Sequence, residues 1–326
     1  MIIDFHTHFY PYSYLDELRK SGGYASLDQD SSGRYIIKYT GDYNILTSPL
    51  VLLDDRLKEM DRTGVDIQVI SLTTPGVERE TPQRGVKLAK MTNDAFASIE
   101  KRYPERFRAL ATLPMQDPGA AADELTRVYE DLGLKGALIP SNVSGVPLDA
   151  PDFLPVFERA ERLGALLFIH PTSPMNTTKM ADYRLVPLIG FGVDTSLTVL
   201  RLVLGGVVEK YPRLKLGASH LGGVYPFLKG RIDLGFKVYP ESGVNLRRPP
   251  SEYLKNIYVD SCGYDTAVIG FVQAWLGSDR ILMGSDYPAQ IADPHAVTRI
   301  NALKIPDAEK NLILGRNAAK LLGIPL

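Results

Sequence analysis

The chain opens with a short apolar run that ends in two histidines, His6 and His8. Side chains two residues apart in a β-strand point to the same side, so both imidazoles would face one point. Apolar runs far downstream lead in the same way into His170, His220 and Asp286. Three imidazoles and a carboxylate can hold a divalent ion and leave a position for water or substrate, as hydrolytic and lyase metal sites require. We therefore predict that His6, His8, His170 and Asp286 bind one divalent metal ion.

The remaining histidines and a nearby carboxylate have other expected roles. His220 can be a fifth ligand or an acid/base beside the metal, and we favour acid/base chemistry because imidazole titrates near working pH. Asp4 is expected on the same side of the first strand as His6 but deeper, as a structural acceptor that supports the ligands. His295 follows Asp293-Pro294 at an expected helix start and is treated as a surface residue.

Eight β-rich apolar runs alternate with segments whose apolar residues recur at helical spacing. The runs cover residues 2–6, 66–72, 107–113, 135–140, 165–170, 214–220, 257–261 and 281–286. This alternation predicts parallel strands with crossover helices, and eight repeats favour an α/β fold of the (β/α)8 TIM-barrel type in one domain, residues 1–326. An open doubly wound sheet is the alternative, and it would also place ligands at strand ends. No glycine-rich phosphate loop follows the first strand, which favours the barrel.

Two stretches interrupt the alternation. Residues 22–49 follow the first strand and contain turn residues at Asp30–Gly33, so we predict a small hairpin insertion over the barrel mouth. Residues 172–192 form a second long connection. Each can be a lid or an ordinary surface connection, and the sequence leaves both interpretations open. Residues 307–322 are predicted to form a helical cap.

Composition restricts the partners. Lys+Arg 37 against Asp+Glu 38, with no long run of either sign, argues against a nucleic-acid or membrane-surface binder and favours a small-molecule partner. The single cysteine, Cys262, excludes an internal disulfide. We find no charged-then-apolar leader and no apolar stretch of about 18 residues, so we expect a cytoplasmic protein without a membrane span.

Four motifs together resemble the amidohydrolase superfamily over essentially the whole chain. They are His6-Thr7-His8-Phe9-Tyr10-Pro11, His170-Pro171, Ser219-His220-Leu221-Gly222-Gly223-Val224-Tyr225-Pro226 and Gly284-Ser285-Asp286-Tyr287-Pro288. Within that superfamily the chain is most similar to the branch of 2-amino-3-carboxymuconate-6-semialdehyde decarboxylase and the metal-dependent aromatic acid decarboxylases. The resemblance implies one divalent ion, zinc first and manganese as the alternative, on the four predicted ligands. It also implies that His220 and Asp286 are catalytic and that the reaction releases carbon dioxide without oxidation.

The resemblance further implies a subunit interface and a substrate. In the semialdehyde decarboxylase an arginine eleven residues after the histidine that matches His220 crosses a dimer interface to bind the substrate carboxylate, and Arg231 stands at that spacing. A homodimer or higher homo-oligomer is therefore expected. Without the resemblance, Arg231 is predicted to be a helix-surface residue. The insertion arginine of that enzyme has no counterpart in residues 42–49, which favours another aromatic, heteroaromatic or muconate-type carboxylic acid over the semialdehyde.

Aromatic residues just beyond strand ends can form the wall of an aromatic-acid site or only pack there. The candidates are Tyr10 and Tyr287, with Phe9, Tyr225 and Tyr264. The rival enzyme class is hydrolysis of a lactone or an amide on the same ligands, which ring opening instead of carbon dioxide release would reveal. A barrel that binds metal without catalysis is disfavoured, because such a site has no physical need for His220.

Overall fold

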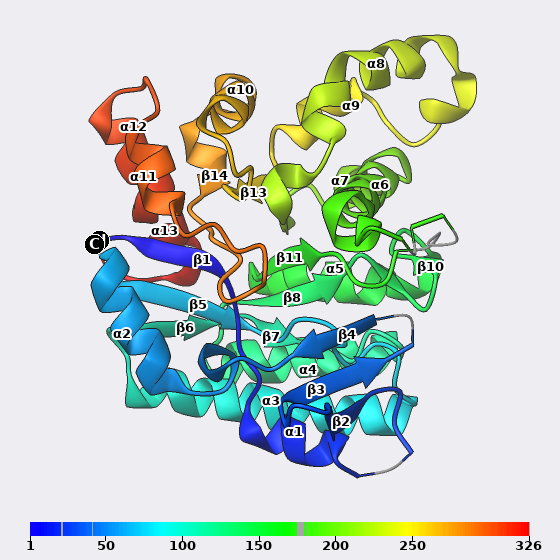
Figure 1. Ribbon diagram of the computed structural model, residues 1–326. Coiled ribbons are helices and arrows are strands. Elements are labelled where there is room, and N and C mark those ends of the chain that lie inside the picture. The colour runs from blue at the N-terminus through cyan, green and yellow to red at the C-terminus, as the bar shows by residue number, and fades with distance from the viewer. Residues whose placement is uncertain (21, 41, 175–178, 181, 326) are drawn as a thin grey trace.

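Parallel strands form the centre of the computed structural model, which describes residues 1–326 except 21, 41, 175–178, 181 and 326 (Figure 1). Six strand segments pair in the order β14-β13-β12-β11-β8-β7 and three in the order β1-β5-β6. Their bounds are β1 (Ile3–His8), β5 (Ile67–Ser71), β6 (Phe107–Ala109), β7 (Ala111–Thr112), β8 (Gly136–Pro140), β11 (Leu166–His170), β12 (Lys215–Ala218), β13 (Tyr258–Asp260) and β14 (Ile281–Leu282). Each segment lies within one of the eight predicted strands or extends it by two residues.

Hydrogen bonds close the two sheets into one barrel. β6 and β7 are consecutive halves of the third predicted strand, separated by Leu110, whose amide donates to the carbonyl of Ile70 over 3.0 Å. At the other seam the Phe5 amide donates to the Met283 carbonyl over 2.8 Å. The predicted (β/α)8 barrel is therefore confirmed, and an open sheet is excluded because both edges are joined.

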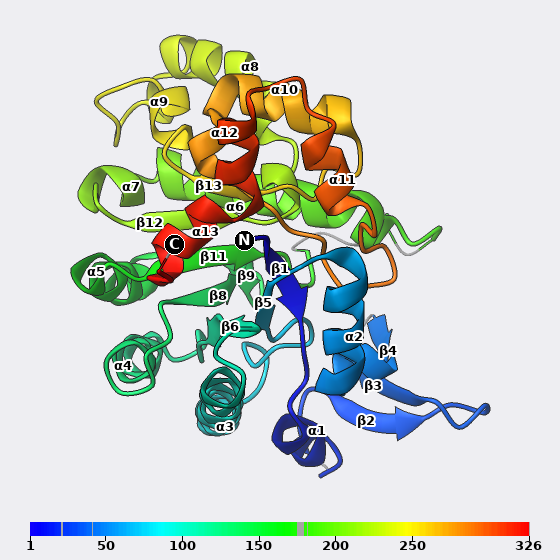
Figure 2. The same ribbon diagram turned by 90° about the vertical axis from the view of Figure 1, so that its left-hand side faces the viewer.

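Helices surround these strands (Figures 1 and 2). Helix α3 shows why they pack there: Leu88, Thr92 and Phe96 recur every four residues, lie on one face and are buried. The helix bounds are α1 (Tyr12–Leu18), α2 (Leu53–Thr63), α3 (Pro82–Arg102), α4 (Pro118–Glu130), α5 (Leu154–Leu163), α6 (Phe191–Leu204), α7 (Val207–Lys210), α8 (Tyr225–Val238), α9 (Pro250–Leu254), α10 (Thr266–Leu276), α11 (Ala296–Asn301), α12 (Asp307–Asn311) and α13 (Asn317–Leu322). Helices α12 and α13 lie in the predicted C-terminal helical cap.

Apolar side chains fill the lower part of the barrel. Ile3, Phe5 and Phe168 belong to one buried cluster, and the rings of Phe5 and Phe168 meet edge to face with centroids 5.3 Å apart. Gly217 on β12 makes room for this packing, because a Cβ there would lie 2.6 Å from the ring of Phe168. With the interior filled in this way, space for a ligand remains at the carboxyl ends of the strands.

The insertion after β1 is larger than the predicted hairpin. It is a three-stranded antiparallel sheet of β2 (Ser26–Gln29), β3 (Tyr35–Tyr39) and β4 (Asp42–Ile45). The turn lies where it was predicted, because the Asp30 carboxylate accepts hydrogen bonds from the amides of Ser32 and Arg34, each over 2.9 Å. The third strand was missed because its four residues are too few to show an alternating pattern. A further short pair, β9 (Asn142–Val143) and β10 (Val146–Pro147), extends the loop after β8.

One expectation about apolar stretches was wrong. Among the described residues, the helical stretch Val186–Leu204 is long and apolar enough to cross a membrane, judged by length and composition. It begins as a π-helical turn, Val186–Gly190, and continues as α6. The α6 side chains Val199, Leu202 and Val203 are fully buried in the protein core, and core helices of non-membrane proteins meet the same criteria.

Candidate metal centre and active site

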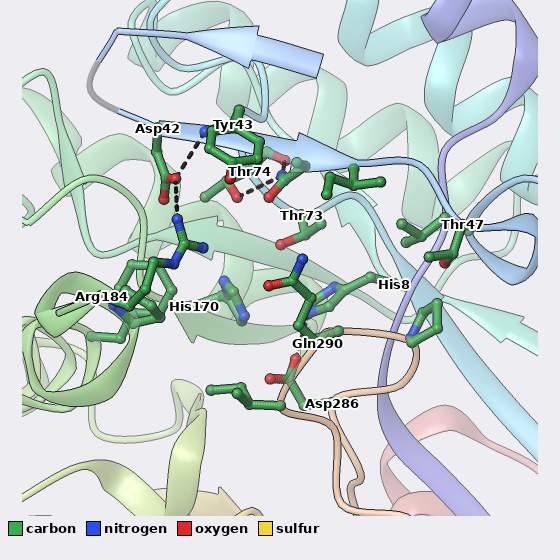
Figure 3. Close-up of a pocket in the computed structure, with 18 of the residues that line it drawn as sticks. His8, Asp42, Tyr43, Thr47, Thr73, Thr74, His170, Arg184, Asp286 and Gln290 are labelled. Atoms are coloured by element: carbon green, nitrogen blue, oxygen red, sulfur yellow. Dashed lines mark hydrogen bonds and ion pairs between the residues drawn. The ribbon is translucent and has the colours of Figure 1, made fainter. Parts of the chain in front are cut away.

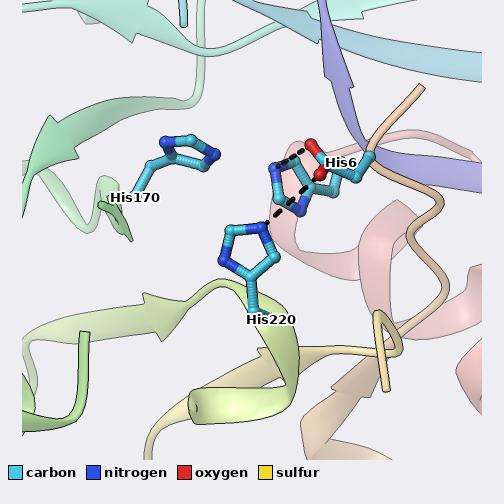
Figure 4. Close-up of side chains that lie close together, drawn as sticks. His6, His170 and His220 are labelled. Atoms are coloured by element: carbon cyan, nitrogen blue, oxygen red, sulfur yellow. Dashed lines mark ion pairs between the residues drawn. The ribbon is translucent and has the colours of Figure 1, made fainter. Parts of the chain in front are cut away.

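The predicted ligands converge at the carboxyl ends of β1 and β11 and in the loop after β14. The Nε2 atoms of His6 and His8 lie 3.1 Å apart. Asp286 Oδ1 lies 3.1 Å from His8 Nε2 and 3.5 Å from His6 Nε2. The His170 ring centroid is 4.8 Å from that of His8 and 5.1 Å from that of His6. Three nitrogen donors and one oxygen donor, separated by up to 280 residues in sequence, therefore face one point (Figure 4 shows His6 and His170).

Hydrogen bonds at Nδ1 determine which nitrogen of two of these rings is free. Ser71 Oγ donates its proton to the Thr7 carbonyl over 2.9 Å, so it can only accept from His8 Nδ1, 3.1 Å away. In the same way His170 Nδ1 donates to the carbonyl of Pro171 over 2.9 Å. Both neutral rings consequently carry their proton on Nδ1 and present an unprotonated Nε2, which is the state that binds a metal.

Asp260 holds the third ring and was not predicted from the sequence. Its Oδ2 accepts from His6 Nδ1 over 2.6 Å and from the His220 amide over 2.8 Å, while its Oδ1 accepts from the amides of Leu221 (2.7 Å) and Cys262 (3.0 Å). Burial raises the pKa of Asp260, but the hydrogen bond and charge of His6 outweigh it and lower the pKa below its usual value. The available signal was its place at the end of β13, the same position that singled out the ligands.

The donor set fits a divalent cation. His170 Nε2 is buried and has no hydrogen-bond partner in the described structure, which is costly for a polar atom unless a ligand satisfies it. Burial lowers the pKa of His170 well below its usual value, and the charges of His8 and His6 lower it further. Burial opposes ionisation of Asp286, but the surrounding histidines hold its pKa well below the usual range. Neutral imidazoles and an ionised carboxylate are the ligand states that zinc and manganese require.

His220 approaches the opposite oxygen of the same carboxylate. Its Nε2 lies 3.6 Å from Asp286 Oδ2, whereas His6 and His8 face Oδ1. Donor atoms of His6, His170, His220 and Asp286 all lie within 4.8 Å of one another. This spacing is compatible with both sequence interpretations of His220, as a fifth ligand and as an acid/base.

The backbone at His220 and Asp286 is not the extended strand expected from the sequence. Their φ angles are +54° and +62°, in the left-handed region that residues other than glycine rarely adopt. The regular strands end earlier, at Ala218 and Leu282. The Asp286 amide donates to the His6 carbonyl over 2.9 Å, and the His220 amide binds Asp260. These bonds hold a conformation that turns both side chains into the barrel mouth.

Asp4 lies away from the donors, contrary to the expectation that it shares a side with His6. The pairing of β1 with β5 shifts by one residue between Asp4 and Thr7, and such a bulge changes which side chains face inward. The Asp4 carboxylate accepts from the amide and hydroxyl of Ser285 over 3.0 and 2.5 Å. Its expected role as a structural acceptor agrees with these contacts.

A cavity of about 230 Å³ opens above the donors (Figure 3). His8, His170, His220 and Asp286 line its floor. Its walls come from the insertion, from the stretch after β11 and from the loop after Asp286; they include Tyr10, Tyr39, Tyr43, Asn44, Arg184, Phe191 and Gln290. Both stretches that the sequence left open as lids or surface connections thus border the site. Apart from Tyr10, these wall residues were missed, because no local pattern shows that two loops far apart in sequence meet.

Most of the residues that were predicted to contact the substrate lie outside this cavity. Arg231 is exposed on α8 and does not line the cavity in the described chain. The guanidinium of the buried Arg56 stacks over the Tyr287 ring, with its carbon 5.1 Å from the ring centroid. Tyr287 lines a different cavity, of about 610 Å³. Tyr10 does line the site, but its hydroxyl donates to the Thr74 carbonyl. Phe9 and Tyr225 are buried outside the cavity, while Tyr264 and His295 are partly or largely exposed.

Comparison with known proteins shows the family to which this chain belongs. The amidohydrolase family model matches residues 3–324. The 2-amino-3-carboxymuconate-6-semialdehyde decarboxylase of Dictyostelium discoideum is 35% identical over 99% of this chain and 91% of its own length. The crystal structure of 5-carboxyvanillate decarboxylase from Sphingomonas paucimobilis has a TM-score of 0.87 at 30% identity and covers 99% of both chains. A dihydroxybenzoic acid decarboxylase from Polaromonas, solved with manganese and 2-nitroresorcinol, has a TM-score of 0.82 at 27% identity, covering 99% of this chain and 97% of its own. The chain therefore belongs to the amidohydrolase family, in the branch that contains the metal-dependent aromatic acid decarboxylases.

Proposed function

We propose that this protein is a metal-dependent carboxy-lyase that removes carbon dioxide, without oxidation, from an aromatic, heteroaromatic or muconate-type carboxylic acid. The observation that carries the proposal is the convergence of the Nε2 atoms of three histidines and one Asp286 oxygen at the base of a cavity, with His220 on the other Asp286 oxygen. The relatives described above have this activity in their names, which supports the same reaction class here. The cavity, at about 230 Å³, is smaller than the roughly 300–1,000 Å³ typical of pockets for drug-sized ligands, which favours a single-ring acid.

His6, His8, His170 and Asp286 would hold one divalent ion, zinc or manganese. Manganese gains support from the Polaromonas decarboxylase structure, and zinc from the predominance of imidazole ligands. When bound, the ion supplies a Lewis acid that orients and polarises the substrate carboxylate and an adjacent oxygen. Asp260, Ser71 and the Pro171 carbonyl keep the three rings in the binding tautomer.

His220 supplies the proton in this proposal. Its Nε2 lies 3.6 Å from Asp286 Oδ2, so the carboxylate can orient the ring. The proton goes to the ring carbon that carries the carboxylate, using a pair of ring π electrons. The carbon becomes tetrahedral, the C–C bond breaks, its electron pair restores the ring, and carbon dioxide leaves. His220 is then reprotonated from solvent, to which its side chain is 13% exposed.

A second copy of this chain is the proposed partner. Phe227, Arg231, Leu234 and Val238 recur at helical spacing along one face of α8, and the three apolar side chains are 80%, 61% and 56% exposed. Helix α8 projects from the periphery of the barrel (Figure 1). A homodimer that covers this stripe would bury Arg231 at its centre and allow the guanidinium to reach the partner's substrate.

The test of the proposed function is product analysis with metal-loaded protein. Hydroxybenzoates, pyrimidine carboxylates and muconate-type acids are incubated with the enzyme, and carbon dioxide release is measured. We expect release from at least one single-ring acid and loss of that release after chelation. Ring opening of a lactone or amide with no carbon dioxide from any acid would instead establish the rival hydrolase.

A further inference from the structure

The outer end of the cavity carries one basic side chain. Arg184 is the only lysine or arginine among the described residues that line this cavity. Its side chain is half exposed, and it pairs with Asp42 at the start of the insertion strand β4 (Figure 3). Residues 42–49 of the insertion contain no lysine or arginine themselves. Within one subunit, Arg184 is therefore the candidate among the described residues for recognising a negative group at this end.

Among the described residues, Arg184 forms one ion pair, and this pair engages only part of its guanidinium. Its Nη1 lies 3.0 Å from Asp42 Oδ1, and the guanidinium carbon lies 5.7 Å from the centroid of the Tyr43 ring. A guanidinium has five N–H donors, and the described part of the chain supplies one side-chain acceptor, Asp42. The Arg184 side chain is 51% exposed, so solvent weakens the pair and a ligand can compete for the guanidinium.

The floor and the outer end together present two positive groups to a ligand. At the floor, a divalent cation with the single carboxylate of Asp286 keeps a net positive charge, which suits one carboxylate of the substrate. At the outer end the free donors of Arg184 suit a second acceptor, and a planar guanidinium binds a carboxylate through two parallel hydrogen bonds. Tyr39, Tyr43 and Phe191 also line the cavity, and their aromatic rings suit an unsaturated spacer.

We propose that Arg184 is a specificity-determining residue that binds a second carboxylate of the substrate, so that the preferred ligand is a single-ring dicarboxylic acid. This inference rests on the proposed function for the identity of the reacting carboxylate. Asp42 is the internal competitor: it occupies Arg184 when the outer end of the ligand is uncharged, and a ligand carboxylate displaces or shares it. Discrimination between monoacids and diacids follows from that competition.

Equilibrium binding tests the inference without turnover. The full-length, manganese-loaded protein is titrated with isophthalate, a ring with two carboxylates, and with benzoate, a ring with one. We expect tighter binding of isophthalate. Arg184→Gln should weaken isophthalate by at least about tenfold, equivalent to about 1.4 kcal/mol, and should change benzoate by less than about twofold. Asp42→Asn should tighten isophthalate, because it removes the competing carboxylate.

Arg201→Gln is the matched control. Arg201 forms an exposed two-point ion pair with Asp149, at 2.7 and 3.0 Å, and does not line the cavity, so its loss should leave both affinities unchanged. Equal weakening of both ligands by Arg184→Gln, or no weakening of isophthalate, would overturn the inference and leave Arg184 with a structural role only, as the ion-pair partner of Asp42. Weaker isophthalate binding by Asp42→Asn would overturn it as well. If the binding pattern holds but no acid releases carbon dioxide, the proposed function fails while the assignment of Arg184 stands.

Discussion

Replacing Asp260 by asparagine tests how the metal ligand His6 is oriented. Each carboxylate oxygen of Asp260 accepts two N–H donors: Oδ2 from His6 Nδ1 and the His220 amide, and Oδ1 from the Leu221 and Cys262 amides. An asparagine has one acceptor oxygen and one NH2 group of nearly the same shape. Whichever way the amide lies, its NH2 group therefore faces two donors.

Both orientations are costly, for different reasons. With NH2 toward His6, the ring must accept at Nδ1 and carry its proton on Nε2, which removes the lone pair that binds metal, and the His220 amide loses its acceptor as well. Loss of such a supporting partner lowers metal affinity by about 10- to 100-fold, or about 1.4–2.8 kcal/mol. With NH2 toward the loop, two buried backbone amides lose their acceptor at about 1–3 kcal/mol each. The asparagine amide should adopt the orientation with the smaller cost, and the measurement should detect that cost.

The assay combines metal competition against a chromophoric chelator with urea unfolding of the metal-free protein. We expect Asp260→Asn to lose at least about tenfold in metal affinity or about 2 kcal/mol in the free energy of unfolding. Glu124→Gln is the control. Glu124 is a buried carboxylate that accepts a hydrogen bond of 2.7 Å from Asn93 Nδ2, and it does not line the cavity. It should lower stability without changing metal affinity. Wild-type values of both quantities in Asp260→Asn would refute the reasoning about the His6 tautomer.

Three further predictions follow from the described contacts. His220→Asn should keep the metal, measured by elemental analysis, and lower kcat by about 10²- to 10⁴-fold, because it removes the proposed proton donor; undiminished turnover would exclude that role. Arg231→Ala should raise KM for the acid substrate. If the arginine acts across a dimer, mixing this variant with His220→Asn should restore part of the activity; inactive mixtures would show that Arg231 is only a surface residue. Burial raises the pKa of Glu100 to about 7 from 4.5, against the hydrogen bond from the Ala109 amide, so the folded protein binds a proton that the unfolded chain has released between these values. Stability should therefore fall by up to about 3 kcal/mol as pH rises through that window, and Glu100→Gln should remove this fall; equal unfolding energies of wild type and variant from pH 5 to pH 8 would contradict it.

The barrel was predictable because its parallel strands are buried on both faces and read as continuous apolar runs. The ligands were visible for the same reason: a histidine or aspartate that ends a buried run must lie at the carboxyl edge, where all strands of a barrel meet. Asp260 ends β13 in the same manner and could have been included. The three-stranded insertion could be located by its turn residues but not extended to β4.

Other features depend on contacts that no local pattern records. The bulge between Asp4 and Thr7 separates Asp4 from the ligands, yet in the sequence the two-residue spacing of Asp4 and His6 places them on one side. The pair of Arg184 and Asp42 joins the stretch after β11 to strand β4 of the insertion, 142 residues apart in sequence. The left-handed backbone of Asp286 is imposed by a hydrogen bond to His6.

The sequence by itself determined the architecture, the four metal-ligand candidates and the neighbouring His220, because hydrophobic periodicity and strand-end position are local properties that the barrel converts into proximity. Only the tertiary structure decided which ring nitrogen is free, which oxygen of Asp286 faces which histidine and which side chains form the outer end of the cavity. Those depend on distances of a few ångströms between segments that are remote in the chain, and such distances are set by packing of the whole barrel.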